Sequence, residues 1–179
     1  LRAKPATVRF RLLGAGAGLG GFSDLSVPMH EFAAWNPPVH TVFITENEVN
    51  GLAYPPVAGG LVVFGLGYGV ERLAAAVWLE QRKVYYWGDL DTHGFAILHR
   101  LRDHIPHAHS FLMDPDTLRA HAEVWVTEPT PFTGELQRLH ERERAVYDTL
   151  RSNQLGDRVR LEQERISFGA VRRALAELT

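Results

Sequence analysis

The chain has 179 residues, of which 45% are hydrophobic and 22% charged, which suits one domain or one domain with an appendage. It contains no Cys, which excludes disulfides, thiolate catalysis and cysteine-based zinc sites. The formal net charge of -2 does not by itself indicate a nucleic-acid binder. No apolar run approaches the ~20 residues that span a bilayer, and the first residues lack a signal-peptide pattern, so we expect a cytoplasmic protein without membrane contact.

The first part of the chain predicts little regular structure. Because the first residue is Leu1 and not Met, we expect a fragment in which residues 3–13 end a linker. The run A-G-A-G-L-G-G at residues 15–21 predicts a mobile loop, since it lacks the Lys-Ser/Thr ending of a phosphate-binding loop. Residues 25–29 predict a short strand. We therefore expect residues 1–38 to be a lead-in segment and residues 39–179 to be the main domain.

Short apolar runs followed by turns and helical patterns predict an α/β fold with a doubly wound parallel sheet. On the second helix we expect Leu73, Val77 and Trp78 to face inward. The expected strands are residues 40–45, 61–64, 84–87 and 110–113, and the expected helices between them are residues 49–54, residues 70–81 and the segment after Gly94.

The remainder of the chain predicts mainly helices, with nine Arg against seven acidic residues in residues 136–179. The longest helix should open at Thr133 and place Leu136, Leu139, Val146, Tyr147 and Leu150 on one stripe. The other expected elements are a helix at 117–121 capped by Asp116, an extended piece at 124–126, a strand at 159–163, and a last helix capped by Ser167 with Val171, Leu175 and Leu178 inward.

Carboxylates gather in two of the turns that end predicted strands. Asp89 and Asp91 follow residues 84–87, and Glu46 and Glu48 follow residues 40–45. In open α/β sheets ligands bind beyond the carboxyl ends of the strands, so we expect Glu46, Asp89 and Asp91 to converge there. Hard oxygen ligands without His or Cys favour Mg²⁺ or Mn²⁺ over zinc. The sequence therefore predicts a divalent-metal site.

Three other interpretations use the same turn. Asp-x-Asp can be a polar turn whose side chains satisfy backbone N–H groups. It can also open a phosphatase in which Asp89 is the nucleophile, but such enzymes want Thr or Val at the position of His93. A dinucleotide fingerprint after G-L-G-Y-G would need a third glycine where Val70 stands.

Further polar residues are candidates for supporting roles. His93 lies inside the acidic turn, where a hydrogen bond to phosphate or water and a structural role are equally open. Glu162 and Glu164 alternate on a predicted strand, which would place both on one face. They could join the metal site or form solvent-facing ion pairs with Arg160 and Arg165.

Several motifs then match a known family in order. I-T-E-N-E followed by Y-Y-W-G-D-L-D-T-H-G-F resembles the Toprim pattern, and G-D-L-D-T-H-G is similar to the G-D-P-D-P-Y-G turn of topoisomerase VI A subunits. E-N-E-V-N, V-F-G-L-G-Y-G, Y-W-G-D-L-D-T-H-G-F-A-I-L, L-M-D-P-D-T-L and R-L-E-Q-E-R-I together resemble the C-terminal domain of the JetD family, the nuclease subunits of Wadjet plasmid-defence systems. The resemblance covers nearly the whole chain.

This resemblance implies a Toprim-like Rossmannoid sheet flanked by helices, with a C-terminal helical extension and with residues 39–179 as the catalytic domain. It also implies Mg²⁺- or Mn²⁺-dependent cleavage of double-stranded plasmid DNA, partner subunits of an SMC-like condensin complex, and a homodimer. By position, Glu46 would be the Toprim glutamate and Asp89 and Asp91 the metal-binding pair. Candidates for contacts with the DNA backbone are Arg160, Arg165 and Arg172.

The chain also departs from the topoisomerase relatives. Their nucleophilic Tyr lies on an upstream winged-helix domain that this chain does not contain, and the Pro and Tyr of their turn are Thr92 and His93 here. Hydrolysis by metal-activated water therefore suits the chain better than a covalent protein-DNA intermediate. The alternatives are a non-catalytic Toprim-like module that binds metal or a partner, and a phosphohydrolase built on the Asp-x-Asp turn.

Overall fold

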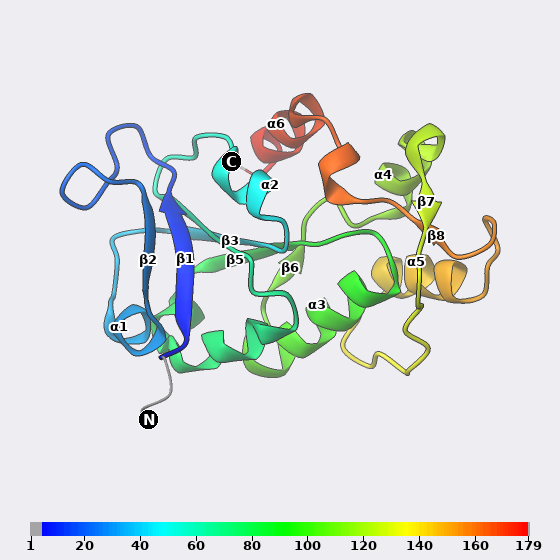
Figure 1. Ribbon diagram of the computed structural model, residues 1–179, viewed down its shortest axis with the longest axis horizontal. Helices are drawn as coiled ribbons and strands as arrows, with labels where there is room; N and C mark the ends of the chain where they lie inside the picture. Colours follow the sequence, from blue (N-terminus) through cyan, green and yellow to red (C-terminus); the bar gives the residue numbers. More distant parts are fainter. Residues whose placement is uncertain (1–4, 179) are drawn as a thin grey trace.

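A six-stranded mixed sheet forms the centre of the computed structural model, which describes residues 5–178 (Figure 1). The strands are Thr7–Leu12 (β1), Asp24–Pro28 (β2), Thr41–Thr45 (β3), Gly60–Phe64 (β4), Lys83–Trp87 (β5) and His109–Ser110 (β6). Their order across the sheet is β2-β1-β4-β3-β5-β6, and the four strands from β4 to β6 are parallel. This arrangement confirms the predicted α/β class and is consistent with a Toprim-like sheet. Residues 1–4 and 179, at the ends of the predicted lead-in and main domain, lie outside the described residues.

The parallel strands bring the two acidic turns together. β3 lies between β4 and β5, and Thr45, the last residue of β3, pairs with Trp87, the last residue of β5. Every residue of β4 is buried, as expected for a strand covered on both faces. Glu46 and Gly88 therefore leave the sheet side by side.

The expected lead-in segment is in fact part of the sheet. β1 pairs antiparallel with both β2 and β4, which contradicts the linker expected at residues 3–13 for its described part. Val8 and Phe10 are buried while Thr7 is exposed, and this alternation is that of a strand with one face on the core. The glycine-rich residues 15–21 belong to the connection between β1 and β2, which contains the bridge between Leu19 and Phe22.

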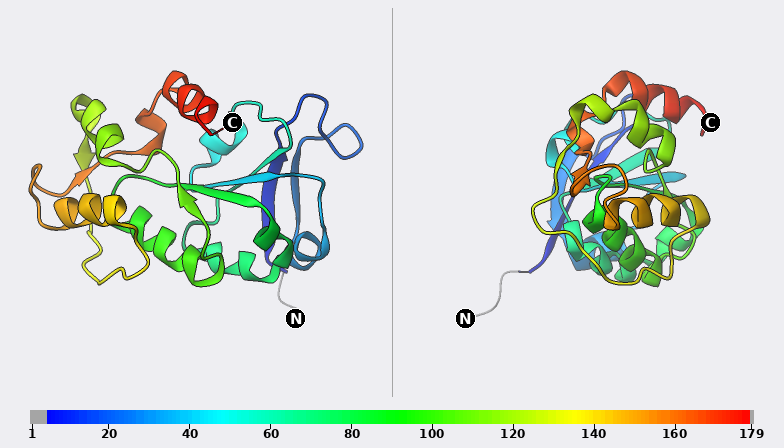
Figure 2. Two further views of the ribbon diagram at one scale, coloured as in Figure 1. Left: turned by 180° about the vertical axis from the view of Figure 1, so that it is seen from behind. Right: turned by 90° about the vertical axis from the view of Figure 1, so that its right-hand side faces the viewer.

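Helical segments cover both faces of the sheet (Figure 2). α3 and the 3-10 helices η1 and η2 lie on one face, and α2 and α6 lie on the other (Figure 1). The bounds are Met29–Ala34 (α1), Glu48–Leu52 (α2), Gly67–Ala75 (η1), Val77–Gln81 (η2), Thr92–His104 (α3), Pro115–Ala120 (α4), Ala122–Val124 (η3), Glu141–Arg151 (α5), Gln163–Arg165 (η4) and Phe168–Ala176 (α6). No helix among residues 5–178 is long and apolar enough to cross a bilayer.

The expected α-helix at residues 70–81 is two 3-10 helices separated at Ala76. Leu73 and Trp78 are buried as expected, but the break turns Val77 outward, where it is 67% exposed. Trp78 donates its indole N–H to the carbonyl of Phe32 at 3.1 Å, which fixes η2 against α1.

The longest predicted helix is shorter than expected, because α5 begins only at Glu141. Leu136 and Leu139 are buried, but in a non-helical segment whose carbonyls accept from side chains instead. Tyr147 donates its hydroxyl to the carbonyl of Gly134 at 2.6 Å, and Arg102 donates to the carbonyl of Arg138 at 2.8 Å. These bonds replace the helical ladder.

Other C-terminal elements also differ in detail. α4 is capped by Asp114 and not by Asp116, because Asp114 Oδ1 accepts from the N–H groups of Asp116 and Thr117. The predicted strands at 110–113, 124–126 and 159–163 shorten to β6 and to the two-residue pair β7, Val126–Thr127, and β8, Val159–Arg160. The cap of α6 by Ser167 is confirmed.

Candidate metal centre

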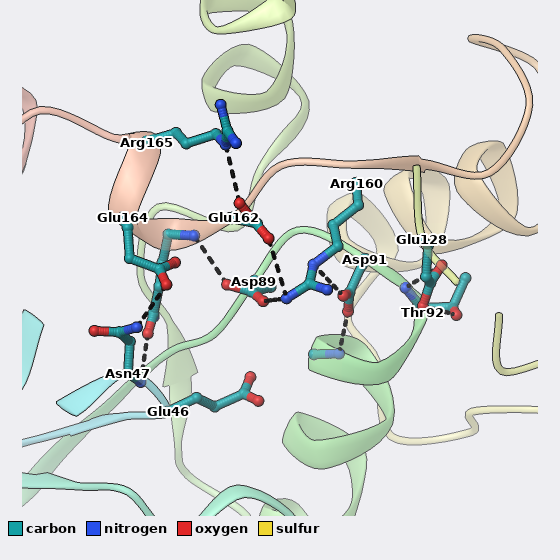
Figure 3. A network of polar contacts seen from close by, with 12 residues as sticks. Glu46, Asn47, Asp89, Asp91, Thr92, Glu128, Arg160, Glu162, Glu164 and Arg165 are labelled. Atoms are coloured by element: carbon teal, nitrogen blue, oxygen red, sulfur yellow. Dashed lines mark hydrogen bonds and ion pairs between the residues drawn. The ribbon is translucent and has the colours of Figure 1, made fainter. Parts of the chain in front are cut away.

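The three predicted carboxylates lie beyond the ends of β3 and β5 and line one cavity (Figure 3). Glu46 follows β3 directly, and its Oε1 accepts from the buried Tyr86 hydroxyl at 2.5 Å. Gly88 permits this approach, since a Cβ there would lie 2.3 Å from Glu46 Oε1. The glycine before Asp89 is therefore required for Glu46 to reach across the end of β5.

Asp91 is held at the start of α3. It is the N-cap of this 13-residue helix, and its Oδ1 accepts from the N–H of Gly94 at 2.7 Å. A Cβ at Gly94 would lie 2.1 Å from the carbonyl oxygen of Asp89, so only glycine allows the helix to begin against the turn. Asp91 is 4% exposed and has one cap oxygen and one oxygen facing its neighbours.

Arg160 lies between the two aspartates. Its Nη2 is 2.5 Å from Asp89 Oδ2, and its Nε is 3.1 Å from Asp91 Oδ2. A bridge between Leu90 and Leu161 holds this segment against the acidic turn. The sequence offered Arg160 as a contact for DNA or a partner of Glu162, and the structure pairs it chiefly with the predicted metal ligands.

The site holds more negative charge than one arginine balances. Burial raises the pKa of Glu46 to about 7, although the hydrogen bond from Tyr86 opposes the rise, and the charges of Asp89 and Asp91 add to it. Burial likewise raises the pKa of Asp91 to about 6, although its bond from Gly94 opposes the rise. A divalent cation would relieve both effects.

A cavity of about 340 Å³ opens over these groups. In it the Tyr68 hydroxyl contacts His93 Nδ1, and His93 Nε2 lies 2.7 Å from the carbonyl of Thr130. Because a carbonyl only accepts, Nε2 carries the proton and Tyr68 donates to Nδ1. Both ring nitrogens of His93 are thus engaged within the protein, which favours its structural role. The lining comprises Glu46, Gly67, Tyr68, Asp89, Asp91, His93, Ile97, Glu128, Pro129, Thr130 and Arg160.

The donor set suits a hard cation. Glu46, Asp89 and Asp91 offer only carboxylate oxygens, as Mg²⁺ and Mn²⁺ prefer. Within residues 5–178, however, no three His, Asp or Glu side chains are gathered closely enough to hold an ion together. Arg160 occupies the space between Asp89 and Asp91 in this arrangement.

The other predicted site residues lie at varying distances from the centre. Glu162 is 2.9 Å from Arg165 Nε and 3.8 Å from Arg160, beside the site. Glu164 lies in η4 and accepts from Asn47 Nδ2 at 2.6 Å, so the shared strand face expected for the two acids was wrong. Glu162 thus makes the expected contacts with Arg160 and Arg165, whereas Glu164 is exposed and bonds to Asn47.

Two predicted residues lie elsewhere. Glu48 is 60% exposed at its side chain and pairs with Arg9 on β1, so it does not join the site. Arg172 lines a groove with Thr41 and Lys83 at the opposite ends of β3 and β5. It therefore does not lie beside the carboxylates, as a contact at the site would require.

Two buried residues that the sequence did not single out complete the site. Gln163 accepts from the N–H of Asn47 at 2.6 Å, donates to the carbonyl of Trp87 at 2.8 Å, and donates its own N–H to Asp89 Oδ1 at 2.9 Å. Gln163 lies between Glu162 and Glu164 in the motif E-Q-E, and the sequence suggested a role only for the two glutamates. Glu128 is 2% exposed and accepts from the Thr92 hydroxyl at 2.6 Å, and no periodicity marks it.

Comparison with known proteins agrees with the resemblance seen in the motifs. A search of curated proteins found no match. Residues 1–175 match the family described as Wadjet protein JetD, C-terminal, which accounts for nearly the whole chain. The chain therefore belongs to the Wadjet protein JetD C-terminal family and has a role in the Wadjet defence system.

Proposed function

We propose that the acidic cavity is the active site of a metal-dependent DNA endonuclease domain that cleaves plasmid DNA by phosphodiester hydrolysis. One observation carries the proposal: three carboxylates from two neighbouring strand ends face one cavity beside an arginine, in a chain of the JetD C-terminal family. Phosphodiester hydrolysis commonly uses carboxylates that bind divalent ions, together with a cationic side chain that binds the phosphate.

Glu46, Asp89 and Asp91 would hold Mg²⁺ or Mn²⁺. When bound, the ion would neutralise phosphate charge and increase the acidity of water. Tyr86 and Gly88 position the carboxylate of Glu46. The hydrogen bond from the N–H of Gly94, at the start of α3, fixes that of Asp91. Binding of one ion by all three carboxylates would still require the side chains to approach further, because Arg160 lies between Asp89 and Asp91.

The side chains also offer proton transfer and phosphate binding. Glu46 would act either as a further ligand of the ion or as the general base that accepts a proton from the attacking water. Its raised pKa of about 7 belongs to the metal-free site, and a bound ion would lower it. Arg160 lines the cavity and can donate to phosphate oxygens, and Arg165 is exposed near it for contacts with the DNA backbone. His93 serves to hold Tyr68 and the Thr130 segment at the cavity wall.

The proposed partners follow from the family and not from a surface of the chain. Double-stranded plasmid DNA would be presented by SMC-like condensin subunits, with two copies of the chain acting as a homodimer. The excess of arginine in residues 136–179 fits contacts with phosphate.

The test is plasmid cleavage by the chain assembled with its Wadjet partners in Mg²⁺ or Mn²⁺. Glu46→Gln and Asp91→Asn should each lower cleavage by about 10²-fold or more, since they remove ligands without changing shape. Glu48→Gln is the matched control, because Glu48 is two residues from Glu46 but pairs with Arg9 outside the cavity. Cleavage by Glu46→Gln at the wild-type rate would contradict the proposal.

The contact of Arg160 with both aspartates also favours a second candidate, a non-catalytic module in which this pairing stabilises the fold. Intact plasmid in the presence of all partners, together with measurable Mn²⁺ binding, would select it. A phosphohydrolase with Asp89 as nucleophile is less compatible, because both oxygens of Asp89 accept contacts from Arg160 and Gln163.

A further inference from the structure

The position of Arg160 suggests how loading of the site is controlled. We propose that Arg160 is an exchangeable internal cation: it competes with the divalent ion for Asp89 and Asp91 until a DNA phosphate draws the guanidinium away. Metal binding and DNA binding would then favour each other. This inference rests on the proposed function and names its regulation.

The competition is for particular oxygens. Asp89 Oδ1 accepts from the N–H of Gln163 at 2.9 Å, and Asp91 Oδ1 accepts from the N–H of Gly94 at 2.7 Å. The Oδ2 atoms lack such a backbone partner in the described part of the chain, and Arg160 contacts both of them. An ion that binds both aspartates through these atoms must displace the guanidinium or share the atoms with it.

The hold on Arg160 is incomplete. Its Nε is buried and lies 3.1 Å from Asp91, yet it makes no hydrogen bond of good geometry within residues 5–178. The side chain keeps 27% of its surface exposed. Arg160 is the last residue of the two-residue strand β8, paired with Val126 of β7, and does not extend from a packed helix. A guanidinium held in this way can leave without breaking the core.

A second position for the guanidinium lies close by. Glu162 Oε1 is 3.8 Å from Arg160 Nη2, and Glu162 itself is fixed by Arg165 Nε at 2.9 Å. A small turn of Arg160 toward Glu162 would free the aspartates and present its N–H groups to a phosphate in the cavity. Because linkage is reciprocal, a phosphate that stabilises this position must raise metal affinity, and the ion must raise DNA affinity.

Mn²⁺ binding tests the exchange without reference to cleavage. Free Mn²⁺ is measured by its electron paramagnetic resonance signal in titrations of the wild-type chain, Arg160→Gln and Arg119→Gln, with and without a short DNA duplex. Without DNA, Arg160→Gln should bind Mn²⁺ about tenfold more tightly than wild type. The duplex should tighten Mn²⁺ binding by wild type about tenfold but have little effect on Arg160→Gln. Arg119→Gln, which removes an exposed arginine that contacts Asp116 outside the cavity, should retain the DNA effect.

Equal Mn²⁺ affinity of wild type and Arg160→Gln, or equal tightening of both by DNA, would overturn the exchange while leaving the nuclease proposal intact. The predicted affinities without any plasmid cleavage in the full complex would support the exchange and overturn the nuclease. Arg160→Lys guards against a folding defect in Arg160→Gln. Because it keeps the charge but loses the fork that spans both aspartates, its Mn²⁺ affinity should lie between the other two. An affinity for Arg160→Lys equal to that of wild type would count against the exchange.

Discussion

Two arginines of this chain contact carboxylates in different ways. Arg102 on α3 is 2% exposed and grips Glu143 with two nitrogens, at 2.5 and 2.8 Å, while its Nε donates to the carbonyl of Ala108. Arg160 is shared between Asp89 and Asp91, is partly exposed, and leaves its Nε without a good hydrogen bond among residues 5–178. Arg102 thus forms a buried, fully hydrogen-bonded ion pair with Glu143, whereas the contacts of Arg160 with the two aspartates are only partly hydrogen-bonded.

The carboxylates record the same difference. Burial alone would raise the pKa of Glu143, but the hydrogen bonds from Arg102 hold it below its usual value. The pKa of Asp91 stays raised, at about 6, despite the nearby Arg160. A pair that lowers the pKa of its acid stabilises the fold, whereas a raised pKa marks charge that folding has left uncompensated. The comparison thus separates a fold-stabilising arginine from one available for function.

The largest expected effect is the loss of the structural pair. Arg102→Met should lower the free energy of unfolding by about 3–5 kcal/mol, because it leaves the buried Glu143 charged without its arginine partner. Urea denaturation followed by circular dichroism measures this. Arg100→Met is the control on the same helix, since Arg100 is half exposed, and it should cost less than ~1 kcal/mol. Similar losses for the two variants would mean that Arg102 stabilises the fold no more than an exposed arginine does.

Removal of a charge at the site should have the opposite effect and raise the free energy of unfolding. Because the pKa of Glu46 rises from 4.5 to about 7 on folding, the folded protein binds this proton more tightly than the unfolded chain. Its contribution to stability is complete below pH 4.5 and is lost as the pH rises to about 7. Glu46→Gln, which can still accept from Tyr86, should therefore stabilise the metal-free chain at pH 8 by about 1–3 kcal/mol.

The measurement is urea denaturation of wild type and Glu46→Gln from pH 4 to pH 8, without divalent ions. The two curves should meet at the acid end and separate as the pH rises. Glu48→Gln, altered at an exposed carboxylate, should follow wild type throughout. A Glu46→Gln curve parallel to wild type over the whole range would mean that folding does not raise the pKa of Glu46.

Gln163 should contribute an intermediate effect. Gln163→Leu keeps the volume but leaves the N–H of Asn47 and the carbonyl of Trp87 without their partner, at a cost of about 1–3 kcal/mol. Gln154→Leu, at an exposed glutamine, is the matched control. If the two variants denature at the same urea concentration, Gln163 does not tie the strand ends together.

The smallest effect is expected at the rim of the site. Arg165→Gln removes a partly exposed contact with Glu162 and should change stability by less than ~1 kcal/mol. Thermal unfolding at low and high salt checks this, because screening should remove what little difference exists. A larger change that persists at high salt would place Arg165 among the structural arginines.

The parts of the fold that the sequence revealed are those with local signals. Continuous apolar runs marked β3, β4 and β5, and Ser167 marked the start of α6. The strand expected at residues 25–29 is present as β2, but β1 was missed because its role depends on pairing with β4, far away in the chain. The extent of α5 was misjudged because Tyr147 and Arg102 satisfy carbonyls that a helix would otherwise have used.

The site was likewise predictable only where its residues follow local signals in the sequence. Glu46, Asp89 and Asp91 follow strand ends, so the rules of parallel sheets bring them together. Arg160, Gln163 and Glu128 reach the site from the C-terminal part by contacts that no spacing in the sequence encodes. The position of Arg160 between the aspartates, on which the exchange depends, therefore could not be predicted from the sequence.

A crystal structure of the chain grown with saturating Mn²⁺ tests the central claim most directly, since anomalous scattering locates the ion. We predict a Mn²⁺ peak at Asp89 and Asp91, within reach of Glu46, with the Arg160 guanidinium moved off the aspartates toward Glu162. An anomalous map without a peak at these carboxylates, and with Arg160 still between Asp89 and Asp91, would contradict the assignment of this cavity as a metal centre.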